Sequence, residues 1–159
     1  ASADMMFVSL NSSDIGLSRD YKAVNFQSTL DTATGAPFIY VGVNLECLSP
    51  VYLNGNRHPS TFDWTLTWVR RGRTNNEWKD LIDVPVGETS ESYDVEIYSS
   101  GTYLTVTRTF TALTSATVSY TSAQQVTDFG SNQATLFVKI YQNSSTVGRG
   151  YPLTTSITR

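Results

Sequence analysis

The fold is decided by the stretch Phe62-Asp63-Trp64-Thr65-Leu66-Thr67-Trp68-Val69-Arg70-Arg71. Its side chains alternate, with Phe62, Trp64, Leu66 and Trp68 on one face and Asp63, Thr65 and Thr67 on the other. A period of two residues over this length is typical of a β-strand with one face in a core and the other in solvent. Two tryptophans and a phenylalanine are a large apolar load, so the stretch predicts a central strand.

The same alternation continues downstream in weaker form, and no segment has a convincing helical period. Further strands are expected over residues 93–98, 103–110, 116–120, 134–142 and 151–157, with one helical turn before Gly130. About seven short strands separated by turn signals predict an antiparallel sandwich. Its predicted core consists of Trp64, Leu66, Trp68, Tyr93, Val95, Ile97, Leu136, Val138 and Ile140.

Upstream of residue 47 the pattern changes to short strands and turns. Residues 38–43 predict a strand with apolar side chains on both faces, which implies that it is covered on both sides, and residues 21–30 alternate loosely. Pro50 suits an edge strand that begins a new unit. We therefore divide the chain into an N-terminal β segment, 1–47, belonging to a preceding β domain, and a sandwich, 48–159.

Composition excludes several classes of function. Of the 159 residues 40% are hydrophobic and 16% charged, and the net charge of −3 includes no basic block, which argues against a nucleic-acid partner. No apolar run approaches the roughly 20 residues that span a bilayer, so membrane insertion is not expected. The start of the chain, residues 1–6, lacks the features of a signal peptide.

The single cysteine, Cys47, and the single histidine, His58, give little basis for chemistry. One cysteine cannot form an internal disulfide, which favours folding in a reducing cytosol, and a buried structural thiol is the expected role. One histidine and one cysteine make a zinc site implausible, and no acidic residue stands at Ca²⁺-loop spacing from Asp128, which is expected to cap a turn. No catalytic residue, metal or cofactor is predicted.

Residues 48–159 resemble a fibronectin type III domain. Pro50 stands in the first strand, Trp68 takes the place of the family's core tryptophan, and Tyr93-x-Val95 stands in the third strand. Val138-x-Ile140-x-Gln142 followed by Gly148-Arg149-Gly150 resembles the family's strand and turn with paired glycines. The chain departs from the family between the fifth and sixth strands, where residues 120–130 replace the usual corner.

A second resemblance covers roughly residues 45–153. Trp68-Val-Arg-Arg-x-Arg73, Val84-Pro-Val-Gly-Glu88 and Asp128-Phe-Gly130, together with the run from Tyr141 to Gly150, look like the C-terminal region of tail-tip or baseplate-hub proteins, including host-specificity proteins, of long-tailed bacteriophages and gene transfer agents. The resemblance implies a virion structural role without catalysis, made in the host cytoplasm. It also implies hub and fibre proteins as partners, a host receptor in reach, and a homotrimer in the assembled tail.

Five residues are candidate partner contacts. Arg70, Arg71 and Arg73 form the only basic cluster, suited to a carboxylate-rich or phosphate-bearing partner, although pairing with Asp80, Asp83, Glu88 or Glu91 is the favoured reading. Arg149 either anchors the last turn through carbonyl groups or makes an exposed contact.

The fifth is Trp78, which with Tyr98 and Tyr103 could stack on sugars, so that a carbohydrate-binding or adhesin module is the alternative function; ordinary sheet packing is the favoured reading of these aromatics.

Overall fold

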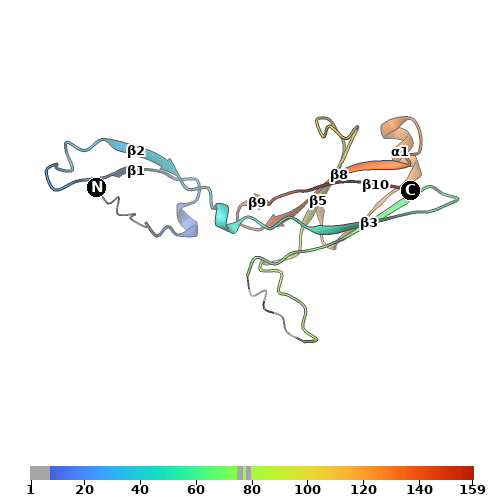
Figure 1. The fold of residues 1–159 in the computed structure, drawn as a ribbon, viewed down its shortest axis with the longest axis horizontal. Coiled ribbons are helices and arrows are strands. Elements are labelled where there is room, and N and C mark those ends of the chain that lie inside the picture. The colour runs from blue at the N-terminus through green and yellow to red at the C-terminus, as the bar shows by residue number, and fades with distance from the viewer. Residues whose placement is uncertain (1–7, 75–76, 78–79) are drawn as a thin grey trace. The chain divides into compact units, whose positions relative to one another are not determined.

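The computed structural model describes residues 8–74, 77 and 80–159. The chain divides into two units, Ala1–Asn44 and Leu45–Arg159. Its sheets are all antiparallel, and the predicted all-β class is confirmed (Figure 1).

The N-terminal unit is built on one hairpin. A short 3₁₀ helix, Ser12–Asp14, precedes β1 (Ser18–Lys22), which pairs with β2 (Gly35–Ile39). Of residues 21–30, which alternate loosely in the sequence, only the first two belong to β1, because residues 25–32 form hydrogen-bonded turns. A second 3₁₀ helix, Val43–Leu45, follows the hairpin.

The strand predicted over residues 38–43 is only partly right. It ends at Ile39, and Gly42 takes a φ of +69°, a left-handed conformation that does not continue a strand. The expectation that both of its faces are covered is wrong within the described chain, since Phe38 is 52% exposed and Val41 57% exposed.

The second unit is a sandwich of two sheets. One sheet has the order β3-β4-β7, and the other has the order β10-β8-β5-β6 with β9 paired to the end of β8. The strands span Val51–Arg57 (β3), Trp64–Val69 (β4), Tyr93–Tyr98 (β5), Val106–Leu113 (β6), Thr117–Tyr120 (β7), Thr135–Ser144 (β8), Gly148–Arg149 (β9) and Leu153–Thr158 (β10). Three strands facing four in this order make a fibronectin type III-like sandwich. β6 starts later than predicted because residues 99–105 close the turn, with Ser99 N–H donating to the Thr105 carbonyl at 3.0 Å.

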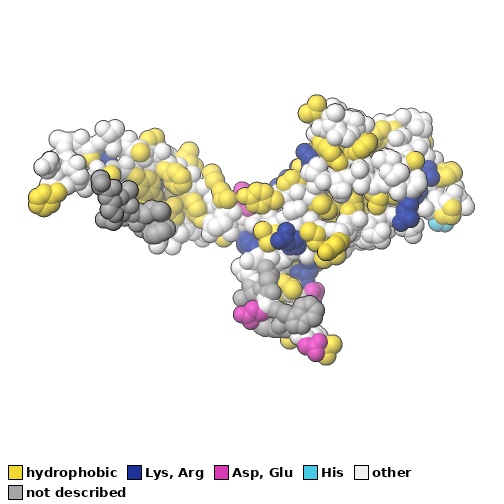
Figure 2. All heavy atoms as spheres, viewed as in Figure 1, with side chains coloured by type: hydrophobic (Ala, Val, Ile, Leu, Met, Phe, Trp, Pro, Cys, Tyr) yellow, Lys and Arg dark blue, Asp and Glu magenta, His cyan; other side chains and the backbone are white. Residues whose placement is uncertain are grey.

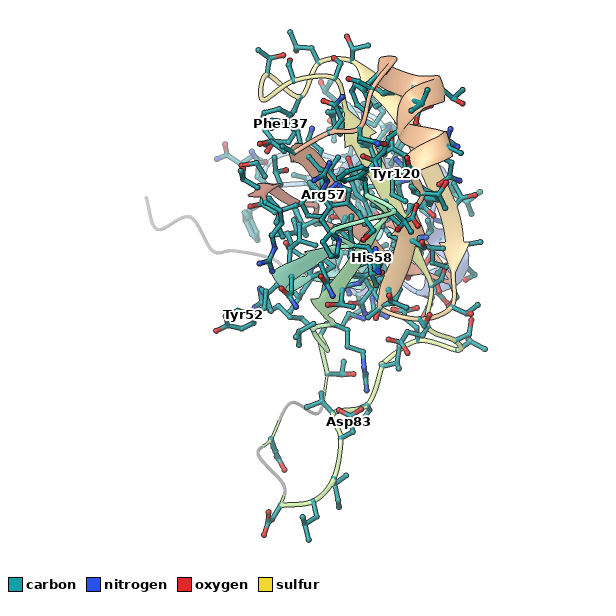
Figure 3. All side chains as sticks on the ribbon, turned by 90° about the vertical axis from the view of Figure 1, so that its right-hand side faces the viewer. Tyr52, Arg57, His58, Asp83, Tyr120 and Phe137 are labelled. Carbon is teal, nitrogen blue, oxygen red and sulfur yellow. The ribbon has the colours of Figure 1, made fainter. Side chains whose placement is uncertain are left out.

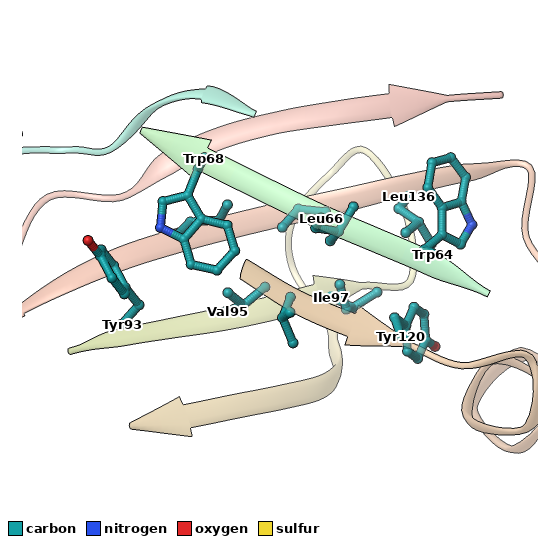
Figure 4. Close-up of a cluster of buried hydrophobic side chains, with 11 residues drawn as sticks. Trp64, Leu66, Trp68, Tyr93, Val95, Ile97, Tyr120 and Leu136 are labelled. Carbon is teal, nitrogen blue, oxygen red and sulfur yellow. The ribbon is translucent and has the colours of Figure 1, made fainter. Parts of the chain in front are cut away.

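The core lies between the two sheets (Figure 4). All nine residues of the predicted core are buried there, and β7 adds Val118 and Tyr120. Trp68 and Tyr93 meet edge to face at one end, with ring centroids 5.3 Å apart, and Phe110 meets Tyr120 at 6.0 Å. These aromatic pairs join the two sheets, because each takes one ring from either sheet.

The segment between β7 and β8 forms the α-helix α1, Ser122–Phe129, longer than the single turn predicted. Thr121 caps its start, and Gly130, with a φ of +76°, ends it. The side chain of Gln125 is fully buried and binds three backbone groups, the carbonyls of Phe62 and Tyr120 and the N–H of Gln133. The helix thus lies where the sequence departs from the fibronectin type III pattern, and Gln125 anchors it there.

Candidate functional site

The four arginines named from the sequence gather at one end of the sandwich. The backbone N–H of Arg71 donates to the side chain of Gln142, at the end of β8. Arg149 stands opposite the next residue, Asn143, in the β8–β9 pairing. Arg73 is linked to Ser144 and Ser145, the residues after Asn143, because the carboxylate of Glu88 binds both Arg73 and the two serine hydroxyls. The end of β8 therefore organises this candidate site.

Arg70 is held by two carboxylates. Its Nη2 lies 2.6 Å from Asp83 Oδ2 and its Nε 3.7 Å from Glu91 Oε1. The Arg70 side chain is 19% exposed, whereas that of Asp83 is 86% exposed, on a loop that extends away from the sheets (Figure 3). The pairing with nearby acidic residues that the sequence favoured is present here, and it lowers the pKa of Asp83.

Arg71 is exposed, and its guanidinium has no ion-pair partner within the described part of the chain. It lines, together with Arg70, an open groove of about 520 Å³. Among the three arginines of the basic cluster, Arg71 is therefore the one whose positive charge is available to a partner protein.

Arg73 belongs to a closed arrangement that we call the Glu88 clasp, made of Cys47, Arg73, Glu88, Ser144 and Ser145. Arg73 Nη2 lies 2.6 Å from Glu88 Oε1, and the Glu88 side chain is almost fully buried. Glu88 Oε2 accepts from both serine hydroxyls and from the Ser145 N–H, at 3.0–3.2 Å. Motifs quoted from three distant parts of the sequence thus meet at one carboxylate, where they stabilise the sandwich.

Cys47 is the fifth member of the Glu88 clasp. Its thiol donates to Glu88 Oε1 at 3.6 Å, and burial, followed by the nearby Glu88 charge, raises the pKa of the thiol to about 11. A nucleophilic cysteine requires a lowered pKa, so this environment is the opposite of an activating one. The buried structural role expected for Cys47 agrees with its position.

Arg149 binds two carboxylates in place of the carbonyl groups of the last turn, which was one of the two contacts expected from the sequence. Its Nε lies 2.7 Å from Asp94 Oδ2 and its Nη1 2.6 Å from Glu96 Oε1, and its guanidinium stacks 4.7 Å from the Tyr141 ring centroid. It therefore crosses the outer face of the four-stranded sheet and ties β9 to β5. The side chain remains 40% exposed.

The two carboxylates under Arg149 are nearly buried. Burial acts to raise the pKa of each, but hydrogen bonds outweigh it. Asp94 accepts from Ala112 N–H and Arg149, and Glu96 from the Tyr98 hydroxyl and Arg149, so both pKa values lie below their usual range.

Asp128 does not cap a turn, which corrects the sequence expectation. It lies in the last turn of α1 and accepts from Arg108 Nε at 2.5 Å, Arg108 Nη2 at 2.9 Å and the Tyr120 hydroxyl at 2.7 Å. Burial alone would raise the pKa of Asp128, but these donors lower it. Asp128, Arg108 and Tyr120 together fix α1 to β6 and β7. The sequence did not indicate these contacts, because the two partners lie 8 and 20 residues away from Asp128.

The aromatic candidates do not form an open platform in the described residues. Trp78 lies outside them. Tyr98 is buried, its ring packs edge to face on Tyr103, and Lys139 Nζ lies 4.9 Å from its centroid. This agrees with the sheet packing that the sequence favoured for the tyrosines.

His58 is engaged in a turn, where its Nδ1 accepts from the backbone N–H groups of Ser60 and Thr61. Within residues 8–74, 77 and 80–159 no group of three or more potential metal ligands comes together. Nor does any helix of that part of the chain have both the length and the apolar character needed to cross a membrane.

No known family model matches the sequence, and the search of curated proteins found no relative.

Proposed function

We propose that this chain is a non-enzymatic structural and interaction module of a bacteriophage tail tip, lying at the baseplate hub or at the connection to the tail fibres. The virion setting is supported by the sequence resemblance over residues 45–153. The structural role is supported by one feature of the fold, the open N-terminal hairpin. In this setting the module is part of a homotrimer and contributes to tail assembly and host attachment.

The hairpin of β1 and β2 has no apolar core of its own among the described residues. None of its large apolar side chains is buried, and several are half exposed or more, among them Phe26, Leu30, Phe38, Ile39 and Val41 (Figure 2). A two-stranded hairpin is at best marginally stable in water, and it becomes stable when it packs against further structure. Apolar surface of this kind marks a site of contact with other protein. The hairpin is therefore suited to pack its exposed apolar side chains against other proteins in an assembly.

The sandwich contributes a loop for display. Leu81 is 98% exposed and Ile82 65% exposed, on the same loop as Asp83. Exposed apolar side chains on a loop held by a rigid scaffold are a common form of partner contact. Neighbouring tail proteins or a host surface receptor are the partners proposed for this loop.

The test is peptide mass spectrometry on purified phage particles from cultures of the source organism. We expect peptides of this chain at a few copies per particle, enriched through particle purification in parallel with known tail proteins. Secreted and cell-wall fractions of the same cultures serve as controls. Peptides found only in those fractions would overturn the proposal and favour the adhesin or carbohydrate-binding alternative, which a glycan array with the wild type and Trp78→Ala would then examine.

A further inference from the structure

Lys139, on the outer face of β8, carries a positive charge without a counter-ion in the described chain. The residue opposite it in β5 is Glu96, and opposite charges at such cross-strand positions normally pair. The carboxylate of Glu96 is instead bound by Arg149 Nη1, at 2.6 Å, and by the hydroxyl groups of Tyr98 and Tyr141. Lys139 Nζ makes no ion pair or hydrogen bond with any described residue, and it is open to solvent.

Two tyrosine rings lie beside this ammonium group. Lys139 Nζ is 4.9 Å from the ring centroid of Tyr98 and 5.7 Å from that of Tyr103, which belongs to the turn between β5 and β6. The two rings meet edge to face, with centroids 5.4 Å apart. Aromatic rings attract a cation but leave its charge in place. Arg149 is stacked on Tyr141 in the same way, but it also has two carboxylates, whereas Lys139 has none.

The charges around Lys139 indicate what it can bind. Its neighbours across the sheet are Glu96 in β5 and Thr154 in β10, and residues 99–105 of the turn contain no charged side chain. Because both carboxylates of β5 lie on Arg149, Lys139 is left to attract an anion from outside. A carboxylate matches its single charge, whereas a phosphate ester, with about two negative charges, would be repelled more strongly by Glu96.

The turn that contains Tyr103 favours a protein as the source of the carboxylate. Leu104, the next residue, is 85% exposed, and Val106, at the start of β6, is 42% exposed. The turn is supported from below, since a Cβ on Gly101 would lie 3.0 Å from the ring of Phe137 (Figure 3). Apolar side chains on a supported turn offer surface that another protein can cover and a small anion cannot.

We propose that Lys139 binds an acidic side chain of a partner protein, whose carboxylate approaches the ammonium group from solvent beside the rings of Tyr98 and Tyr103. The rings already position the lysine side chain, so binding requires little further ordering of it. The inference rests on the interaction role proposed above and names the chemistry of one contact. It does not depend on the virion setting, so the particle analysis and the binding test below can fail independently.

The test follows the lysine side chains of the full chain by NMR, after labelling with ¹³C-lysine. The lysines are Lys22, Lys79 and Lys139, and the substitutions Lys22→Met and Lys139→Met assign their Cε–Hε signals. The probes are N-acetyl-aspartyl-leucinamide and its neutral counterpart, N-acetyl-asparaginyl-leucinamide. We expect the aspartyl probe to shift the Lys139 signal saturably, the asparaginyl probe to have little effect, and the Lys22 signal to stay in place. The titration uses the wild-type protein, so it does not depend on a variant that folds.

Two matched variants measure the contribution of the charge, in titrations that follow the signals of the probe itself. Lys139→Met removes the ammonium group and keeps an unbranched side chain over the rings. It should weaken binding of the aspartyl probe about two- to fivefold, the factor that corresponds to an exposed ion pair. Lys22→Met removes the same charge from a side chain whose ammonium donates to the Leu30 carbonyl, and it should leave the affinity near that of the wild type.

Equal losses of affinity in the two variants would overturn the assignment to Lys139, since they would reflect net charge alone. Equal shifts by the aspartyl and asparaginyl probes would overturn the carboxylate as the ligand. A Lys139 shift caused by methyl glucuronide and not by the aspartyl probe would overturn the protein partner in favour of an acidic sugar. If none of these probes moves the Lys139 signal, Lys139 is not a carboxylate-binding residue.

Discussion

Trp68 is the residue whose side chain fills the end of the core beside Tyr93, and only 5% of its surface is exposed. Trp68→Ala should lower the free energy of unfolding by about 3–5 kcal/mol, because it removes a large buried side chain and leaves a cavity. Urea unfolding followed by circular dichroism measures the loss. Val69→Ala, on the exposed side of the same strand, is the control and should change stability by about 0.5 kcal/mol or less. A Trp68 loss below a third of the expected value would contradict its place in the core.

Cys47 gives a second prediction at this scale. Because burial and Glu88 raise the pKa of its thiol to about 11, almost none is thiolate at pH 8, and the thiolate is the reactive form. We expect slow reaction of the native protein with a disulfide reagent such as dithionitrobenzoate, and fast reaction in concentrated urea. Equal rates in the two states at pH 8 would show that the thiol is not protected by the fold.

At the scale of elements, the turn that carries β9 contains two glycines needed for different reasons. Gly148 has a φ of +82°, with open space around it. A Cβ on Gly150 would lie 2.2 Å from the Cys47 carbonyl oxygen, so β9 could not stay in place against the start of the sandwich.

Gly148→Ala should therefore cost about 1–2 kcal/mol of stability through backbone strain. Gly150→Ala should cost more, because the backbone of Cys47 cannot yield as a flexible side chain would. Thermal or chemical unfolding of the two variants provides the comparison. A smaller loss for Gly150→Ala than for Gly148→Ala would show that the close approach to Cys47 is not maintained.

The strands of the sandwich could be predicted from the sequence because apolar side chains that face the core alternate with polar ones on the other face, which leaves a period of two residues in the chain. Trp64, Leu66 and Trp68 show it most clearly. Outside the strands that signal fails. Gln125 and Asp128 are polar residues whose partners come from other elements, so their burial cannot be read from neighbours along the chain.

The candidate site was less predictable for a related reason. The basic cluster indicated ion pairs, and within the described residues Arg70 and Arg73 form them. The contact of Arg149 with Asp94 and Glu96 spans more than 50 residues and depends on the strand register, which composition does not reveal. Likewise, the sequence does not indicate that Trp64 Nε1 donates to the Gln133 carbonyl whereas Trp68 Nε1 has no hydrogen-bond partner among the described residues.

For the whole molecule, folding lowers the pKa values of Asp94, Glu96 and Asp128. These carboxylates therefore stabilise the fold above their unfolded pKa values, near about 4, and that stability is lost as the pH falls through the lower, folded values. We expect the free energy of unfolding to be smaller at pH 3 than at pH 7 in urea titrations.

Arg149→Met should make the free energy of unfolding depend less on pH, because Asp94 and Glu96 lose the cation that lowers their pKa values. Lys22→Met removes the same charge from a side chain that has no carboxylate partner in the described chain, and it should leave the dependence nearly unchanged. Identical pH profiles for the two variants would show that Arg149 does not govern the stability of the sheet face.

The directions of β3 and β10 determine how the sandwich responds to tension. Both strands begin at the end where Tyr151 N–H donates to the Cys47 carbonyl, and both finish where Arg159 Nε donates to the Gly55 carbonyl. A pull between residues 45 and 159 would slide β3 along β4 in one direction and β10 along β8 in the other. Hydrogen bonds between antiparallel strands lie across such a pull, so they would be loaded in shear and would break together instead of being unzipped one by one. Linked in series with other domains, this sandwich would hold its length under force up to a single rupture.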